Sequence, residues 1–253
     1  MEYEIIKQAF KLGNSAGVLL PIEWKGKKVS IRLIEKSLVR EILEILEERG
    51  MLENTIGVFL AGSYARGEET EKSDVDVLVI TNDVDKQIKV GKYEIICISK
   101  DKFEKALVKN LYLASLVNEA KAILNSEFLQ ECKKKVSIFP IKKYLNEILS
   151  MTKINEMAVK IDEELGENVS DETIYSVILR LRELYLIECL TASKNSSNRE
   201  FVSLVRKIAS EEAHNSYLRI KNDLKPKKAI SVKEAIALIE DIKKRVENLK
   251  DDK

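Results

Sequence analysis

Two aspartates, Asp74 and Asp76, stand two residues apart where an apolar, β-like run (VDVLVI, residues 75–80) begins. Alternate side chains of a strand project from one face, so we expect these carboxylates to lie about 7 Å apart on the same face. The two carboxylates repel each other unless a cation lies between them. Mg²⁺ binds one or two carboxylates together with substrate phosphates and water, and two such ions can stabilise the attacking and leaving oxygens of a phosphoryl displacement. The pair therefore predicts divalent-metal chemistry.

A glycine-rich turn, GSYARG at residues 62–67, lies between the preceding apolar run and the two aspartates. Gly62 allows the backbone to approach a ligand closely, Ser63 adds a hydroxyl donor, and the N–H groups at the start of a short helix point outward. This combination predicts a phosphate-binding turn. Gly-Ser and Ser-Asp turns are each common in ordinary loops. The prediction therefore depends on the two occurring together between two strands.

The elements that must position these residues alternate between strands and helices up to about residue 100. Apolar runs at 55–61, 75–80 and 93–98 predict strands, and the periodicity of 38–49 predicts a helix. Beyond this point the candidate helices are 100–109, 111–124, 141–150, 153–165, 171–192, 199–209, 211–222 and 231–250. The last of these opens on the capping-box residues Ser231 and Glu234. The chain therefore predicts an α+β fold, with a small mixed sheet followed by a helical bundle.

The segment GSYARGEETEKSDVDVLVI (62–80) resembles the GSxARGxxxxxSDxDxxV signature of the minimal nucleotidyltransferases in the DNA polymerase β superfamily. The resemblance implies a small mixed sheet with helices on one side. It also implies transfer of a nucleoside monophosphate from an NTP, with ATP favoured, to an acceptor hydroxyl, using two Mg²⁺ ions and three carboxylates. Asp74 and Asp76 would bind both ions and act in catalysis. The implied nucleotide-binding residues are Gly62, Ser63, Arg66 and Ser73.

Two assignments leave alternatives open. The third carboxylate of the family lies on a following strand, where this chain has Glu94 in place of the more common Asp. Glu94 would help to hold the catalytic metal or accept the acceptor's proton, and its alternative is an ordinary edge-strand charge in solvent. Arg66 would pair with a phosphate, and its alternative is an ion pair with Glu68 or Glu69.

The N-terminal segment KLGNSAGVLLPIEWKGKKVSIRLIE (11–35) resembles the swapped-hairpin modules of AbrB/MazE-type regulators, especially archaeal versions. The resemblance implies two interleaved copies that bind DNA. The residues themselves agree with a homodimer, because three short strands within about 35 residues are too few to bury a core alone. The expected phosphate-contacting residues are Lys11, Lys25, Lys27, Lys28 and Arg32. The alternative is a dimerisation module whose lysines are only solvated.

The helical part from about residue 126 resembles the bundles, some of them HEPN-type, that are appended to such transferases as acceptor-binding domains. Arg180, Arg182 and Tyr185 would line the cleft, and their alternative is ordinary helix surface and packing. Ribonuclease HEPN domains need an arginine and a histidine four to six residues apart. The single histidine, His214, follows Arg206 by eight residues, so ribonuclease activity is not expected. One histidine also excludes Ser-His-Asp and His-rich zinc chemistry.

Composition limits the remaining classes. The chain has 253 residues, 45% of them hydrophobic, which is enough for an ordinary core. Its 43 basic and 42 acidic side chains give a net charge of +1, which excludes a globally basic nucleic-acid coat. No apolar stretch reaches the roughly 18–20 residues of a membrane helix, and three scattered cysteines form neither a disulfide framework nor a metal pair. These features favour a cytoplasmic protein that does not bind membranes.

We therefore expect three parts, at residues 1–36 (AbrB-like module), 37–125 (nucleotidyltransferase domain) and 126–253 (helical bundle). Three functions compete. The first is nucleotidyl transfer, with AMP the expected group, to a protein or tRNA, as in antitoxins that adenylylate a partner toxin. The second is transfer to a small molecule of the aminoglycoside type. The third is a DNA-binding regulator whose transferase core only senses nucleotide. The two aspartates argue against the third, and the N-terminal module argues against the second.

Overall fold

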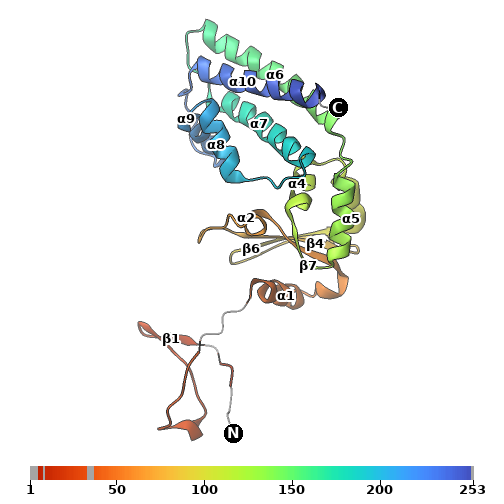
Figure 1. The fold of residues 1–253 in the computed structure, drawn as a ribbon. Helices are drawn as coiled ribbons and strands as arrows, with labels where there is room; N and C mark the ends of the chain where they lie inside the picture. The colour runs from red at the N-terminus through yellow and green to blue at the C-terminus, as the bar shows by residue number, and fades with distance from the viewer. Residues whose placement is uncertain (1–4, 8, 33–36, 252–253) are drawn as a thin grey trace. The chain divides into compact units, whose positions relative to one another are not determined.

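A computed structural model describes residues 5–7, 9–32 and 37–251, and the chain divides into two compact units, 1–38 and 39–253 (Figure 1). The second unit is built on a five-stranded sheet with the strand order β5-β6-β4-β3-β7. Its strands are β3 (Thr55–Leu60), β4 (Val75–Thr81), β5 (Lys86–Val90), β6 (Tyr93–Ser99) and β7 (Lys121–Leu124). Strands β4 and β6 run parallel, and the other pairs are antiparallel. This mixed sheet with its helices confirms the α+β prediction.

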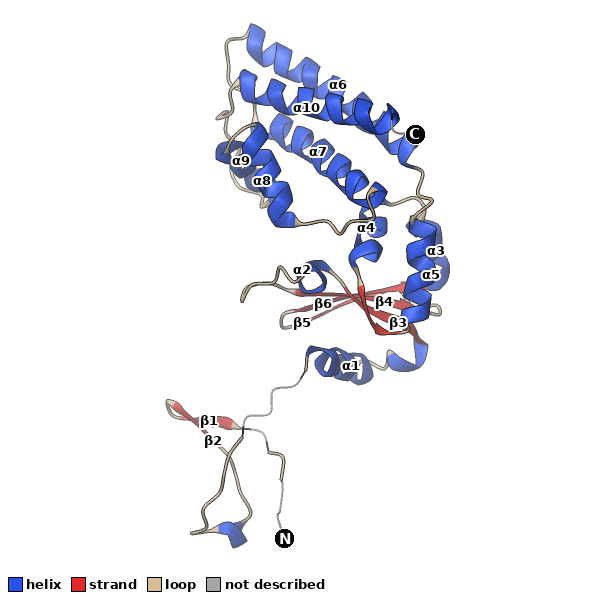
Figure 2. Cartoon of the chain, in the orientation of Figure 1, coloured by secondary structure: helices blue, strands red, loops and turns tan. Residues whose placement is uncertain are grey.

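Helices cover both faces of the sheet (Figure 2). One face carries α1 (Leu38–Glu48), whose amphipathic pattern buries Ile42, Ile45 and Leu46. The other face carries four helices, α2 (Gly62–Arg66), α3 (Lys100–Leu107), α4 (Leu111–Glu119) and α5 (Ser126–Val136). The central strand β4 is accordingly buried on both sides, with Val77, Leu78, Val79 and Ile80 at most 3% exposed. The expectation of helices on one side only is therefore wrong for this chain.

The helical bundle consists of α6 (Ile141–Glu164), α7 (Asp171–Thr191), α8 (Asn198–Ile208), α9 (Glu211–Lys221) and α10 (Val232–Asp251). Helix α7 lies at its centre and contacts α6, α9, α10 and also α4 of the sheet region. One continuous hydrophobic cluster includes Phe59 on β3, Val117 on α4, Leu184 on α7 and Ile239 on α10. The sheet and the bundle therefore share a single core.

A buried ion pair fixes the start of α7. Asp171 is fully buried and accepts hydrogen bonds from Arg219 Nε at 2.6 Å and from the backbone N–H of Lys227 at 2.8 Å. Burial alone would raise the pKa of Asp171, but the hydrogen bonds from Arg219 and Ser216 hold it below its usual value. The ion pair ties α9 and the following loop to α7.

Four elements differ from the sequence prediction. Residues 121–124 form strand β7 rather than the end of a helix, because they pair with β3 at the sheet edge. Helix α5 and strand β5 were not predicted. The two helices expected at 141–150 and 153–165 form one helix, α6. The Ser231–Glu234 capping box is confirmed, since the Glu234 N–H donates to Ser231 Oγ at 3.3 Å and the Ser231 N–H donates to Glu234 Oε2 at 3.1 Å.

Among the described residues of the N-terminal unit, β1 (Phe10–Leu12) pairs with β2 (Ser15–Gly17) in a hairpin, and Ile22–Trp24 form a 3-10 turn. The three short strands were expected at 3–10, 18–21 and 29–33. Residues 18–21 and 29–32 form no strand, and residues 1–4, 8 and 33–36 lie outside the described chain. None of this unit's described residues is buried, and Ile6, Leu19, Ile22 and Ile31 are 72–77% exposed. Strands need a neighbour for their backbone hydrogen bonds, and one copy of this segment supplies too few.

Among the described residues, no helix is both long enough and apolar enough to cross a membrane.

Candidate functional site

Three charged residues form a row across strands β5, β6 and β4, near the first residues of β4 and β6. The parallel register of β4 and β6 places Asp76 opposite Glu94, and the antiparallel register of β5 and β6 places Lys89 opposite Glu94. Residues paired in register project from the same face. Lys89 forms an ion pair with Glu94, whose side chain is 31% exposed. The row therefore runs Lys89, Glu94, Asp76, and it brings together two of the three carboxylates expected from the sequence.

The remaining expected carboxylate, Asp74, precedes β4 and is exposed. The pKa of Asp76 is raised, first because the side chain is partly buried and then because Glu94 and Asp74 repel its negative charge. Arg66 acts in the opposite direction but does not cancel these effects. The arrangement thus carries more negative charge than its own cations neutralise, and a bound cation would stabilise it.

The turn after β3 packs directly on Asp76. Gly62 has a φ of +62°, and a Cβ atom at this position would lie 2.0 Å from Asp76 Oδ2. The Ala61 N–H donates to the Asp76 carbonyl oxygen at 2.8 Å. Only glycine fits this position, because it lacks the Cβ and tolerates a positive φ. The start of α2, with the half-buried Ser63, is therefore held against the carboxylate row.

Arg66 and Ser73 make intramolecular contacts. Arg66 Nε donates to Glu68 Oε2 at 2.9 Å and Nη1 donates to Glu119 Oε1 at 2.7 Å, so the ion pair with Glu68 that was the alternative for this residue is present. Ser73 Oγ accepts from the Thr70 N–H at 2.9 Å and closes the turn before β4. Nucleotide binding by Arg66 and Ser73 stays a prediction.

The two glutamates around Arg66 also bind the loop between α7 and α8. Glu119 accepts from Ser196 Oγ at 2.8 Å, and Glu68 accepts from Ser197 Oγ. We call these five residues, Arg66, Glu68, Glu119, Ser196 and Ser197, the Arg66 clasp. Burial raises the pKa of Glu119, and Arg66 opposes the shift. The clasp connects the glycine-rich turn to the helical bundle.

Replacing Glu119 with alanine should lower the free energy of unfolding by about 2–3 kcal/mol, because it leaves the largely buried Arg66 guanidinium with one carboxylate instead of two. Urea denaturation monitored by circular dichroism measures the change. Glu127→Ala, at an exposed position on α5, is the control and should change the stability by less than about 0.5 kcal/mol. Equal effects of the two substitutions would show that the clasp does not stabilise the fold.

The bundle residues predicted to line a cleft make internal contacts. Arg182 lies over the ring of Phe201 at 5.2 Å, and the Tyr185 hydroxyl accepts from the Ser197 N–H at 3.0 Å. Arg180 forms an ion pair with Glu183 at 3.2 Å. These contacts match the packing alternative, but Arg182 and Tyr185 also line a small hollow of about 20 Å³ together with Arg66. Their role in a cleft stays a prediction. The lone His214 stacks on Tyr217, as expected for a structural histidine.

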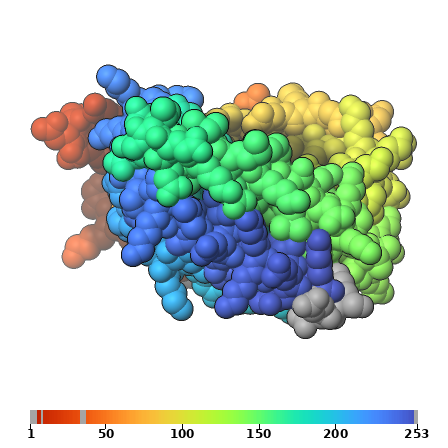
Figure 3. All heavy atoms as spheres, turned by 90° about the horizontal axis from the view of Figure 1, so that it is seen from above, coloured from red at the N-terminus to blue at the C-terminus, as the bar shows by residue number. Residues whose placement is uncertain are grey.

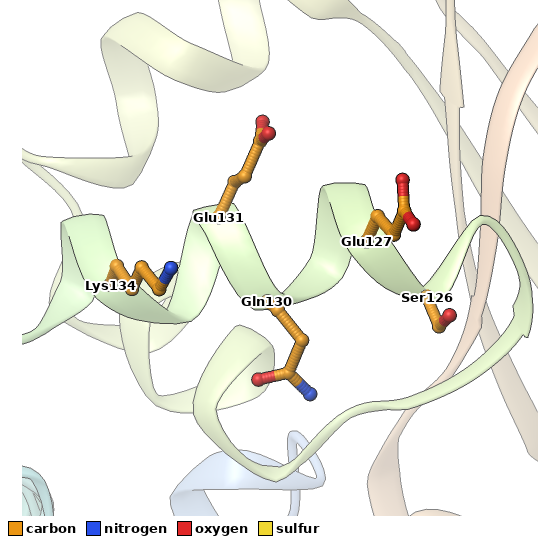
Figure 4. A pocket seen from close by; sticks show the side chains of 5 residues that line it. All are labelled: Ser126, Glu127, Gln130, Glu131 and Lys134. Carbon is orange, nitrogen blue, oxygen red and sulfur yellow. The ribbon is translucent and has the colours of Figure 1, made fainter.

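A surface hollow of about 340 Å³ runs along α5 (Figure 4). Its lining residues are Ser126, Glu127, Gln130, Glu131 and Lys134. All come from one exposed helix, so no groups from different elements converge there, and the hollow is not a candidate active site.

The donor set fits a hard cation such as Mg²⁺, because all three expected ligands are carboxylates, which offer oxygen. Within residues 5–7, 9–32 and 37–251, no three Asp, Glu, His or Cys side chains converge tightly enough to form a finished metal site. Glu94 forms an ion pair with Lys89, so its carboxylate is directed at a lysine. Lys89 and Glu119 are the two residues that sequence reasoning missed.

Replacing Lys89 with glutamine should tighten Mn²⁺ binding in the absence of nucleotide by about fivefold, because Glu94 loses the cation that competes with the metal. Isothermal titration calorimetry gives the dissociation constant. Lys92→Gln is the matched control, because Lys92 is a neighbouring exposed lysine that lies over the Tyr64 and Tyr93 rings. Unchanged Mn²⁺ affinity in Lys89→Gln would show that this ion pair does not compete with a metal.

The five expected DNA-contacting residues lie in the separate N-terminal unit. Lys11, Lys25, Lys27, Lys28 and Arg32 are all exposed. Their side chains are available to a partner, and DNA contact by them stays a prediction.

Comparison with known proteins shows which sequences and structures this chain resembles. A family model described as "Nucleotidyltransferase domain" matches residues 39–249. A putative protein adenylyltransferase of Methanocaldococcus jannaschii is 34% identical over 89 residues, which cover 33% of this chain and 88% of that protein.

Two solved structures are more distantly similar. A nucleotidyltransferase-like protein of Exiguobacterium sibiricum has a TM-score of 0.40 and 15% identity, covering 84% of this chain and 75% of its own. A spectinomycin adenyltransferase of Enterococcus faecialis, solved with ATP and spectinomycin, has a TM-score of 0.42 and 13% identity, covering 83% of this chain and 98% of its own.

Proposed function

We propose that this chain, which belongs to the nucleotidyltransferase domain family, transfers AMP from ATP to a hydroxyl group of a protein. The observation that carries the proposal is the register that sets Asp76 beside Glu94, with the Gly62 turn packed on Asp76. An acceptor oxygen would form a bond to the α-phosphorus, the bond to the bridging oxygen would break, and pyrophosphate would leave. The hydroxyl proton would pass to Glu94 or to water.

Asp74, Asp76 and Glu94 are the residues that would hold two Mg²⁺ ions. When bound, such ions neutralise the charge that develops on the attacking and leaving oxygens. Gly62 and Ser63 would receive the β- and γ-phosphates on the backbone N–H groups of the turn and on the serine hydroxyl. The raised pKa of Asp76 supports this proposal through its second cause, because after burial the shift comes from repulsion by Glu94 and Asp74, which a bound cation would relieve.

A protein acceptor is supported by the similarity to the putative protein adenylyltransferase, which is confined to a third of this chain. A partner toxin is one protein of this kind. Transfer to tRNA and transfer to a small molecule of the aminoglycoside type are the other outcomes that the experiment must separate.

The test uses the purified full-length protein, Mg²⁺ and each α-³²P-labelled NTP in turn, with host lysate as the pool of acceptors. The Asp74→Ala/Asp76→Ala double variant is the blank. We expect ATP to label the protein fraction, with no label in the RNA or small-molecule fractions. Label confined to either of those fractions would replace the proposed acceptor class. Absence of label with every NTP would contradict the transferase proposal.

For the N-terminal unit we propose pairing with a second copy and, through that dimer, DNA binding. The specific observation is that both the apolar and the basic side chains of this unit are exposed. This is expected if a second copy covers the apolar residues and leaves the basic residues for DNA. Binding to the chain's own promoter DNA should weaken steeply with salt. Equal, weak affinity for promoter and unrelated DNA would leave dimerisation as the role of this unit.

A further inference from the structure

An apolar stripe runs along the solvent-facing side of α6. It consists of Met151, Ile154, Met157, Ile161 and Leu165, which are between 36 and 67% exposed. Spacings of three and four residues place them on one side of the helix. The opposite side packs into the bundle and buries Ile148 and Val159, among others. Figure 3 shows α6, in green, forming an open surface next to α10, in blue.

We propose that this stripe is an interface for a second copy of the chain, with the two α6 helices antiparallel about a two-fold axis near Ala158. The stripe is nearly symmetric about that residue. Met151 precedes it by seven residues and Leu165 follows it by seven, while Ile154 and Ile161 lie four before and three after. A reversed copy therefore meets the same pattern, as an isologous interface requires.

The residues at the centre suit a helix crossing. Ala158 is small and allows the two backbones to approach, and Met157 beside it has a flexible side chain that fills irregular gaps. Large residues occur toward both ends of the stripe, where two crossing helices diverge.

The charged residues beside the stripe are also complementary between two antiparallel copies. Lys153 precedes the midpoint by five residues and Glu164 follows it by six, so each lysine comes opposite the glutamate of the other copy. Both side chains are exposed, and within the described part of the chain the charge of Lys153 acts on the neighbouring Glu156, whose pKa it helps to lower. The antiparallel pairing would form this contact twice, which favours a second copy over an unrelated partner.

Engineered cysteines in the full-length protein test the pairing. In the proposed dimer the two copies of residue 157 are about 3 Å apart along the helix axis, whereas the two copies of residue 165 are about 21 Å apart. Met157 and Leu165 are matched in exposure, at 66 and 67%. The native Cys97, Cys132 and Cys189 are at most 5% exposed and do not compete.

We expect Met157→Cys to form a disulfide-linked dimer under mild oxidation and Leu165→Cys alone to form none. A mixture of Met151→Cys and Leu165→Cys proteins should cross-link to each other, because these positions face one another across the axis. Adding Ile161→Glu to Met157→Cys should lower the cross-linking rate at least tenfold. Lys153→Glu should lower it, and Lys153→Glu/Glu164→Lys should restore it.

The test depends on which cysteine positions cross-link and not on how much dimer forms. Pairing through the N-terminal units would produce dimers even if the α6 helices did not meet. Cross-linking of Leu165→Cys to itself as fast as Met157→Cys would contradict the antiparallel pairing. Absence of cross-linking at Met157→Cys would contradict the interface, whether the stripe is open or covered by the chain's own N-terminal unit. None of these outcomes depends on the proposed transfer reaction.

Discussion

Replacing Asp76 with asparagine should lower the rate of AMP transfer by at least about a thousandfold, or about 4 kcal/mol in activation free energy, without unfolding the protein. The substitution keeps the shape of the side chain but removes the charge that would hold a metal between β4 and β6. Single-turnover transfer of radiolabelled AMP measures the loss. Asp101→Asn, at an exposed position on α3, is the control and should retain activity.

The same variant should be at least as stable as the unaltered protein when metal is absent. The pKa of Asp76 is raised in the fold, so its contribution to stability is complete at low pH and is lost as the pH rises through the folded-state value. At neutral pH the ionised carboxylate therefore destabilises the fold, and asparagine removes that effect. Thermal unfolding at pH 7 in EDTA should give an equal or higher Tm. A lower Tm together with lost activity would point to a structural role.

Replacing Gly62 with alanine should abolish most of the activity, by at least about a hundredfold, and should destabilise the fold by about 2–3 kcal/mol. Two causes act together. Alanine is strained at a φ of +62°, and its Cβ would lie 2.0 Å from Asp76 Oδ2, so the carboxylate must move. Denaturation and transfer assays on the same preparation measure both effects.

Gly50→Ala separates the two causes. Gly50 has a φ of +64°, nearly that of Gly62, but nothing lies within 4 Å of a Cβ at this position. The Gly50→Ala variant should lose only roughly 1 kcal/mol of its free energy of unfolding, which is the cost of alanine at a positive φ, and should keep full activity. In an Asp76→Ala background, Gly62→Ala should cost less stability than it does alone, because most of the clashing atoms are gone. Full additivity of the two substitutions would show that the close contact does not matter.

The core of the site followed from the sequence because its residues are close together in the chain. Gly62, Ser63, Asp74 and Asp76 lie within one strand-turn-strand unit, where local spacing determines which side chains share a face. Glu94 could be placed because the resemblance named a following strand. Its partner Lys89 could not, because β5 is short and polar and becomes a strand only by pairing with β6.

Other residues were missed because tertiary contacts determine their roles. Glu119 sits at the end of α4 and meets Arg66 only after the sheet and helices have packed. Residues 121–124 continue a helical pattern, but pairing with β3 makes them a strand. The N-terminal unit shows a related limit, since among its described residues only β1 and β2 pair and the apolar residues of the alternating segments stay exposed.

The continuous core from β3 to α10, together with the Arg66 clasp, limits how this protein can evolve or be engineered. The bundle shares one hydrophobic core with the sheet and is joined to it by the Arg66 clasp. We therefore expect that replacing the bundle alone with that of a relative would destabilise the sheet as well. A chimera would need to carry α4 and the α7–α8 loop together with the bundle.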